Sequence, residues 1–273
     1  MAVSETHPKI YLTPARAAAL QAAYTADNNF SGVFTTIKEY IDRRITNNDA
    51  TASLQGSNPQ FICECAALVA NVTQVAGYIN AAKGYKDVLI AMAPADSWDA
   101  GTRNRLLALS YIYDWLYDEF DAAEREAIRD EMYSIIDYSA NQSGEDDWLA
   151  NPDFINGHTR YGNICVFIAC LTVYGEDVRF NTPFSTSYAN ITGAGGYNAV
   201  QNYIASYGGH QMGWKYGGSY TSPEHLIAWY TATGEKWCEN FINNVGYWYI
   251  YAVDADGRHV EDNVIGRFWH RVV

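Results

Sequence analysis

The fold of this chain is decided by Thr102–Phe120 (TRNRLLALSYIYDWLYDEF), which runs directly into Asp121–Glu124 (DAAE). The first segment is apolar around much of a helical circumference, a pattern typical of an inner helix flanked by others. The second is a capping box, with Asp at the N-cap and Glu three residues later. We therefore expect a buried helix followed by a second helix that continues to about Ala140.

Helical signals recur on both sides of this pair. Thr13 is an N-cap residue and Pro14 takes the first helical position of an Ala-rich segment. The apolar segment Phe61–Ala82 is long enough for one continuous helix that ends near Gly84. Further helices are expected over 163–174, ending at Gly175, over 222–233, ending at Gly234, and over 236–252.

The pattern predicts an all-α fold, because strand alternation is weak along most of the chain. The exception is 258–273, which follows the turn signal Asp254–Gly257 and is expected to begin β-structure that stops mid-pattern at a truncated C-terminus. Helix, short turn and helix recur in succession. Antiparallel hairpins of this kind close into an (α/α) toroid or pack as an irregular bundle, and the pattern fits both equally.

Composition excludes several classes of protein. The 273 residues are 48% hydrophobic and 18% charged, which is globular rather than disordered. The net charge of −13 repels nucleic acid and anionic membrane, so neither is expected as a partner. An anionic polysaccharide would need a locally basic cleft. No apolar run approaches the roughly 20 residues of a membrane span, and residues 1–7 lack the apolar core of a signal peptide.

Cysteine and aromatic usage give two further expectations. The five cysteines show no zinc spacing, and their odd number argues against a full disulfide framework, so buried free thiols are expected. Aromatic residues reach 15%, with 22 Tyr and 8 Trp. They form either a Tyr-rich core or a groove whose rings stack on sugars, and composition leaves both open.

Two polar, Gly-broken islands carry the candidate chemistry: Asn156–Asn163 (NGHTRYGN) and Gly208–Tyr216 (GGHQMGWKY). Each lies at the edge of an apolar segment, where a helix is expected to start. They supply Asn, His, Arg, Lys and Tyr, residue types that bind a carboxylate and move a proton beside it. The islands therefore point to chemistry on an acidic substrate.

Four segments together resemble the heparinase II/III-like polysaccharide lyases. His7–Arg16 (HPKIYLTPAR) is similar to that family's opening HPRLLLTPER. Leu109–Asp118 (LSYIYDWLYD), followed by Ala123–Ile128 (AEREAI), is similar to its AYDWLYD and EREAI helix pair. The two islands are similar to its NNH…GN and GG..EG..Y segments. The four occur in the family's order and cover most of the chain.

The resemblance implies an (α/α) toroid, here residues 1–253, normally followed by an antiparallel β-sandwich. Residues 254–273 would be the linker and first strand of that sandwich, the rest of which is absent. It also implies β-elimination on a uronic-acid-containing polysaccharide such as alginate or a glycosaminoglycan, in the periplasm or after secretion. No cofactor is expected in the toroid, and a structural metal would belong to the absent domain. The oligomeric state is left open.

The chemistry of β-elimination assigns roles to the island residues. The site must neutralise the uronate carboxylate, take the C5 proton and protonate the O4 leaving group. Asn156 and His158 are expected on the carboxylate, with His158 as a candidate base, and Tyr216 as the acid or as acid and base together. Arg160 and Lys215 would supply positive potential. The substrate-binding candidates are Arg160, Tyr161, His210, Trp214, Lys215 and Tyr220, the last also competing with Tyr216 for the catalytic role.

Departures from the family pattern keep two other functions open. Gly157 stands where many relatives have a second Asn, and Met212 where they often have Glu. One alternative is an inverting glycoside hydrolase of the α/α-barrel type, which needs two separated carboxylates. The other is a non-catalytic carbohydrate-binding fragment. The carboxylates available to a hydrolase are Asp147, Asp153 and Glu224, and the remaining histidines considered are His225 (as packing), His259 and His270.

Overall fold

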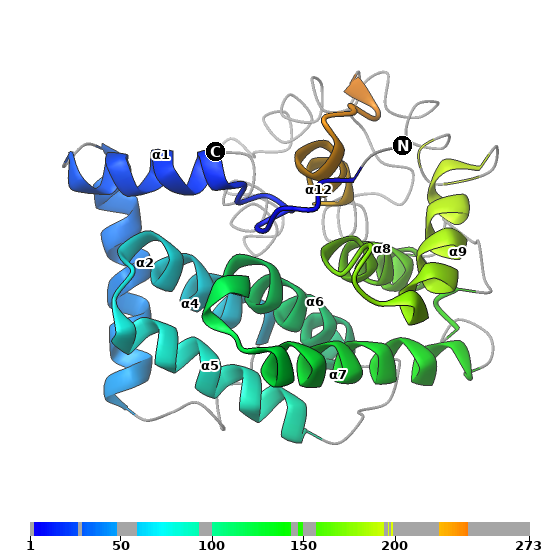
Figure 1. The fold of residues 1–273 in the computed structure, drawn as a ribbon, viewed down its shortest axis with the longest axis horizontal. Coiled ribbons are helices and arrows are strands. Elements are labelled where there is room, and N and C mark those ends of the chain that lie inside the picture. The colour runs from blue at the N-terminus through cyan, green and yellow to red at the C-terminus, as the bar shows by residue number, and fades with distance from the viewer. Residues whose placement is uncertain are drawn as a thin grey trace, which may run out of the picture.

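The computed structural model describes residues 3–26, 29–47, 59–92, 100–142, 147–149, 157–193, 196, 198 and 224–239, with the backbone alone at 29–31, 100–101 and 157–160. Over these ranges the chain is mostly helical and contains no β-strand, which confirms the all-α class for them (Figure 1). The predicted strand in 254–273 lies outside the described ranges. The helices are α1 (Pro14–Thr25), α2 (Asn29–Thr46), α4 (Pro59–Thr73), α5 (Ala76–Ala91), α6 (Ala100–Trp115), η1 (Tyr117–Glu119), α7 (Ala122–Ala140), α8 (Gly157–Thr172), η3 (Val178–Phe180), α9 (Asn181–Thr192) and α12 (Glu224–Thr233).

The predicted pair of helices is α6 and α7, although α6 ends at Trp115 and the short 3-10 helix η1, which was not predicted, completes the segment before Asp121. Every side chain of 102–116 is buried, so α6 is covered on all sides. Asp121 caps α7 by accepting the backbone N–H of Glu124 at 2.8 Å, and the Glu124 carboxylate accepts the Asp121 N–H at 3.1 Å. The long α7 then buries a single stripe of its surface. That stripe consists of Ile128, Met132, Ile135, Ile136 and Ser139.

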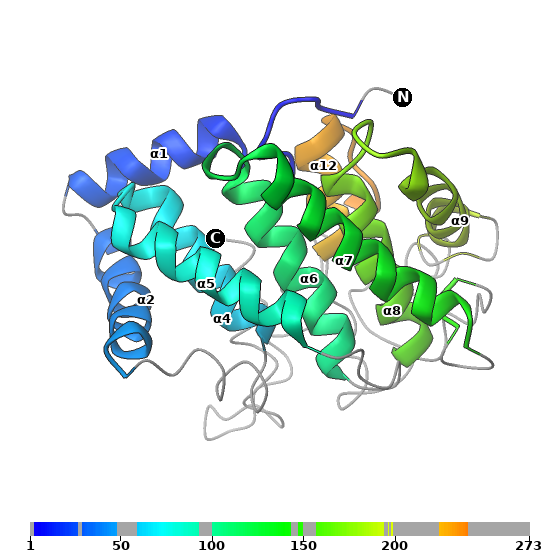
Figure 2. The same ribbon diagram turned by 60° about the horizontal axis from the view of Figure 1, so that its bottom comes forward.

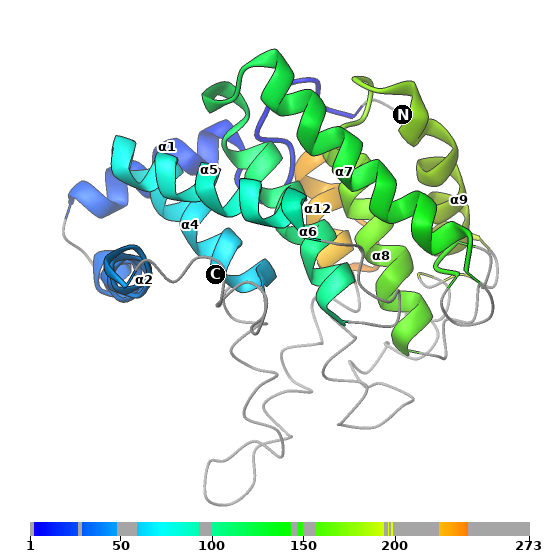
Figure 3. The same cartoon turned by 90° about the horizontal axis from the view of Figure 1, so that it is seen from below.

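Inner helices such as α6 alternate along the chain with outer helices such as α7, and the two kinds form two layers. The inner helices α4, α6 and α8 pack side by side in chain order, and α12 packs on α8. α5, α7 and α9 each pack against the inner helix that precedes them. Figure 2 shows α5 and α7 across the near side of α4, α6 and α8. Seen from below in Figure 3, α6 and α8 both begin at the same lower side, so these two inner helices run in the same direction.

The segment predicted as one helix over 61–82 is two helices, so that prediction is wrong. α4 ends at Thr73 and α5 begins at Ala76, while Gly84 lies inside α5 rather than at its end. Gln74 makes the break, because its φ of 55° is in the left-handed region that no helix can continue through. Glycine is the residue that usually takes this conformation, so a glutamine here does not predict a turn.

The glycine stops are confirmed, whereas two helix starts differ from expectation. Gly175 and Gly234 take φ values of 82° and 76° just after α8 and α12 end. α8 begins at Gly157, six residues before the predicted start, because the first polar island joins the helix. Of the helix predicted over 236–252 only 236–239 are described, and 236–238 are not helical.

The N-terminal clasp, defined here as residues 3–12, crosses the end of α6 and reaches α12. The carbonyl of Ile10 accepts the indole N–H of Trp115 at 3.1 Å, and the Ser4 N–H donates to the carbonyl of Ala232 at 2.8 Å. After the clasp, Thr13 caps α1 through the backbone N–H of Arg16, as predicted. The opening motif of the chain therefore lies against the helix that carries the second motif, Leu109–Asp118.

The predicted state of the cysteines is confirmed, since all five are free and buried. Burial raises the pKa of the Cys63, Cys65 and Cys170 thiols far above the ordinary value, which keeps them protonated and unreactive. Many aromatic rings are also buried. Tyr111 and Tyr113 of α6 are inaccessible to solvent, so much of the aromatic content of the described ranges belongs to the core.

Candidate functional site

The first polar island forms the N-terminal end of α8. Gly157 is the first helical residue, and His158 and Arg160 follow within the first turn, where the structure describes their backbone. Asn156 lies just before the described range. The prediction that this island marks a helix start is therefore confirmed, and the first backbone N–H groups of α8, which have no acceptor within the helix, belong to the candidate residues.

Tyr161 joins the starts of three helices. Its hydroxyl lies 3.2 Å from Oε1 of Gln60 and donates to it, and Gln60 is the second residue of α4. The guanidinium of Arg103, in the first turn of α6, lies 5.5 Å from the centre of the Tyr161 ring. All three side chains are buried. The N-terminal ends of α4, α6 and α8 therefore meet around one aromatic ring, which we call the Tyr161 junction.

The charge of the Tyr161 junction favours an anion. Each helix N-terminus carries a partial positive charge, and three of them converge here. Arg103 adds a full positive charge, in cation–π contact with Tyr161. Two residues further along α6, on the other face of the helix, Arg105 forms an ion pair with Glu131, and burial raises the pKa of that carboxyl. The helix N-termini and Arg103 thus bring positive charge to this end of α4, α6 and α8.

Gly162 and Asn163 fix a neighbouring tryptophan rather than face a substrate. A Cβ on Gly162 would stand 2.5 Å from Cγ of Trp148, so the indole occupies the space that a side chain would need. The Asn163 amide donates to the carbonyl of Trp148 at 3.0 Å. Trp148 is itself 2% exposed. These two island residues thus hold the segment before α8 against the helix.

The second island lies outside the described residues, as do several other candidates. The structure therefore leaves the predicted pairing of the two islands as a prediction. Of the hydrolase carboxylates, Asp147 accepts the backbone N–H of Leu149 at 3.0 Å, and Glu224 is the buried first residue of α12. His225 is also buried, 3.4 Å from Oδ1 of Asn198. The candidates outside the described residues are Asn156, His210, Trp214, Lys215, Tyr216, Tyr220, Asp153, His259 and His270.

Gln60 and Arg103 are neighbours of the site that the sequence reasoning missed. Neither belongs to a motif segment, and each lies about one helical turn or less from the start of an apolar helix. A signal was nevertheless present. Arg103 lies near the start of a segment whose apolar pattern predicts a buried helix, and a charge at such a position must be held by specific partners.

Two features are absent from the ranges that the structure describes. No group of three or more His, Cys, Asp or Glu side chains is arranged to hold a metal ion. No helix there has the length and apolar character needed to cross a membrane.

Two comparisons of the sequence with known proteins found no match. Neither the models of known protein families nor the sequences of characterised proteins match this chain.

Proposed function

We propose that this chain is a polysaccharide lyase that cleaves a uronic-acid-containing polysaccharide by β-elimination. The observation that carries the proposal is the Tyr161 junction, where three helix N-termini and the buried Arg103 lie beside the first turn of α8. An acidic chain that acts on an acidic polymer needs local positive charge of this kind. His158 and Arg160 belong to that first turn.

The proposed reaction uses the island residues in complementary roles. Asn156 and the helix N-terminus of α8 bind the uronate carboxylate, and the nearby positive charge stabilises the enolate-like state that forms when C5 loses its proton. His158 takes that proton. Tyr216 donates its phenolic proton to O4 as the C4–O4 bond breaks, and the C4–C5 double bond forms. Solvent then restores both side chains.

The proposal includes an incomplete (α/α) toroid as the architecture. Parallel packing of inner helices, with an antiparallel partner on each, is the arrangement that such a toroid repeats. At the end opposite the Tyr161 junction, the Asn71 amide of α4 donates to the carbonyl of Trp115 of α6 at 2.8 Å. The N-terminal ends of α4 and α6 thus lie together, and so do their C-terminal ends. This parallel packing supports the proposed toroid. The substrate class implies a periplasmic or secreted protein without a resident cofactor.

A direct test incubates the 273-residue chain with alginate, heparan sulfate and hyaluronan in separate reactions. A lyase creates a conjugated uronate, so ultraviolet absorbance should rise with one of them. His158→Ala and Tyr216→Phe should each lower the rate by about 100-fold or more, the usual effect of losing a general acid or base. Tyr230→Phe, on an exposed tyrosine of α12, is the matched control and should leave the rate unchanged.

Other outcomes would redirect the assignment. New reducing ends without ultraviolet absorbance would indicate the hydrolase chemistry of Asp147, Asp153 or Glu224. Binding of a polysaccharide without turnover in the unmutated chain would indicate a carbohydrate-binding fragment. Unchanged lyase activity in both His158→Ala and Tyr216→Phe would reject the assigned catalytic residues.

A further inference from the structure

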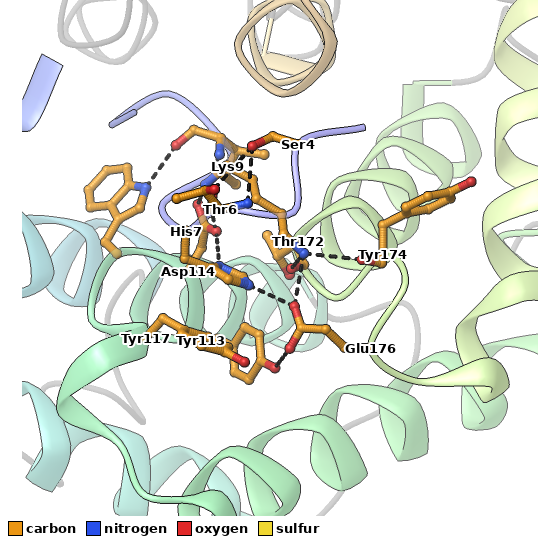
Figure 4. A network of polar contacts seen from close by, with 12 residues as sticks. Ser4, Thr6, His7, Lys9, Tyr113, Asp114, Tyr117, Thr172, Tyr174 and Glu176 are labelled. Carbon is orange, nitrogen blue, oxygen red and sulfur yellow. Dashed lines mark hydrogen bonds and ion pairs between the residues drawn. The ribbon is translucent and has the colours of Figure 1, made fainter. Parts of the chain in front are cut away.

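His7 lies between two carboxylates, at the centre of the network drawn in Figure 4. Its Nδ1 atom is 2.6 Å from Oδ1 of Asp114, and its Nε2 atom is 2.7 Å from Oε1 of Glu176. The ring stacks on Tyr117, with the ring centres 3.9 Å apart and the planes 3° from parallel. A neutral imidazole has one N–H, whereas this geometry asks both ring nitrogens to donate. The arrangement therefore fits the doubly protonated, cationic form of His7.

Both carboxylates also accept hydrogen bonds from other donors. Asp114 accepts the backbone N–H groups of Lys9 and Ile10. Glu176 accepts the Lys9 ammonium at 2.8 Å and the Tyr113 hydroxyl at 2.5 Å. Burial alone would raise the pKa of Glu176, but its hydrogen bonds outweigh that effect and lower the pKa to about 2. Two carboxyl groups, each positioned by several donors, thus face the ring of His7.

The same balance acts on His7 itself. Burial lowers the pKa of His7, and Lys9 lowers it further, but the hydrogen bonds to Asp114 and Glu176 outweigh both, so the pKa is raised above its ordinary value. A raised pKa in the folded state means that the stabilisation is fully present below the unfolded pKa and is lost as pH rises through the folded one. The titratable and charged groups around His7 are Asp114, Glu176, Lys9, Tyr113, Tyr117 and Arg129.

Loss of the His7 proton would act on more than one element. His7 belongs to the N-terminal clasp, whose two ends also bind α12. The Ser4 N–H donates to the carbonyl of Ala232, and the Tyr11 N–H donates to Thr231 Oγ1 at 2.9 Å. A clasp that loosens at His7 therefore releases one of the supports of α12.

We propose that the N-terminal clasp is a proton-dependent latch, closed while His7 carries both ring protons and loosened when His7 loses one. In the closed state the imidazolium joins Asp114 of α6 to Glu176 after α8. In the open state one of the two carboxylates faces an unprotonated nitrogen, and the contact becomes repulsive. The latch is independent of the lyase assignment, because none of its residues belongs to the polar islands.

The test is backbone hydrogen exchange of the whole chain from pH 5 to pH 9, with each rate divided by its intrinsic rate at that pH. We expect the protection of the Lys9 and Ile10 amides to fall at least tenfold as His7 titrates, above pH 6.5. Amides in the middle of α8 serve as the internal control and should change much less. His7→Gln cannot titrate, so its clasp protection should be lower and independent of pH.

Two results would overturn the latch: flat clasp protection in the unmutated chain, or an equal fall in His7→Gln. If His7→Gln does not fold, nitrogen-15 NMR of the His7 ring in the unmutated chain decides the matter alone. Both ring nitrogens should be protonated at pH 6.5, and a titration midpoint below 6.5 would reject the proposal. Glu176→Gln removes one anion and should lower that midpoint, whereas an unchanged midpoint would contradict the role of Glu176.

Discussion

Asp114 binds the backbone N–H of Lys9 with both of its carboxylate oxygens, at 2.9 and 3.0 Å, across 105 positions of the sequence. Lys9 belongs to the first motif segment and Asp114 to the second. Two motifs that are far apart in the chain are therefore complementary parts of one buried contact. The contact gives these two segments of the chain a structural role, separate from any catalytic one.

Asp114→Asn should destabilise the protein strongly. The side chain is fully buried, and the amide would present a donor or a single acceptor where the carboxylate accepts from Lys9, Ile10 and His7. Removing one partner of a buried ionic contact typically costs about 3–5 kcal/mol. Urea unfolding at pH 7 measures the difference. Asp118→Asn, at an exposed position of η1, should stay within about 0.5 kcal/mol, and equal losses in the two variants would contradict this reading.

Glu176→Gln should change the acid sensitivity of the fold. The pKa of Glu176 is lowered to about 2, so its stabilisation is present above the unfolded value near 4.5 and is lost as pH falls toward 2. The unmutated chain should exceed Glu176→Gln in unfolding free energy by about 1.5–3 kcal/mol at pH 6, and by progressively less at pH 4 and 3. Chemical unfolding at each pH gives both values. Glu126→Gln, exposed on α7, is the control, and a pH-independent difference for Glu176→Gln would be the contrary result.

Gly162→Ala should cost about 1–3 kcal/mol, because the added methyl group meets the buried ring of Trp148. Near-ultraviolet circular dichroism should report a disturbed tryptophan together with the loss of stability. Gly84→Ala in α5 is a matched substitution with open space around the new methyl group. It should stabilise the chain by about 0.5–1 kcal/mol, because alanine favours a helix interior. A loss in both variants would mean that crowding at Trp148 is not the cause.

Local sequence signals predicted those parts of the fold that depend only on contacts between residues close together in the sequence. The Asp121 capping box, the Thr13 cap and the stop at Gly175 depend on contacts within a few residues, and all are confirmed. The break at Gln74 was missed because glutamine rarely takes the left-handed backbone found there, between the packed helices α4 and α5.

In the candidate site, too, local sequence signals were predictive and contacts between distant segments were not. Polar residues that break an apolar pattern identified the start of α8, including Tyr161. Gln60 and Arg103, which surround Tyr161, come from helices 101 and 58 positions earlier, and only the packing of α4 and α6 brings them there. α2 and α9 also went unpredicted. The roles given to Asn156, His158 and Tyr216 stay predictions, since their side chains lie outside the described part of the chain.

Two substitutions of Tyr161 separate its hydroxyl from its ring. The hydroxyl donates to the buried Gln60, so Tyr161→Phe should cost about 1 kcal/mol of stability and leave the KM of a uronate polymer within about twofold. Tyr161→Leu also removes the ring that packs against Arg103. Under the proposed lyase function, the guanidinium would lose its platform and attract the substrate carboxylate less well. KM should then rise severalfold more than in Tyr161→Phe, with kcat less affected. Steady-state lyase kinetics and urea unfolding give both quantities. If Tyr161→Phe raised KM as much as Tyr161→Leu while stability stayed unchanged, the hydroxyl would contact substrate directly, and Tyr161 would bind the polymer rather than position Arg103.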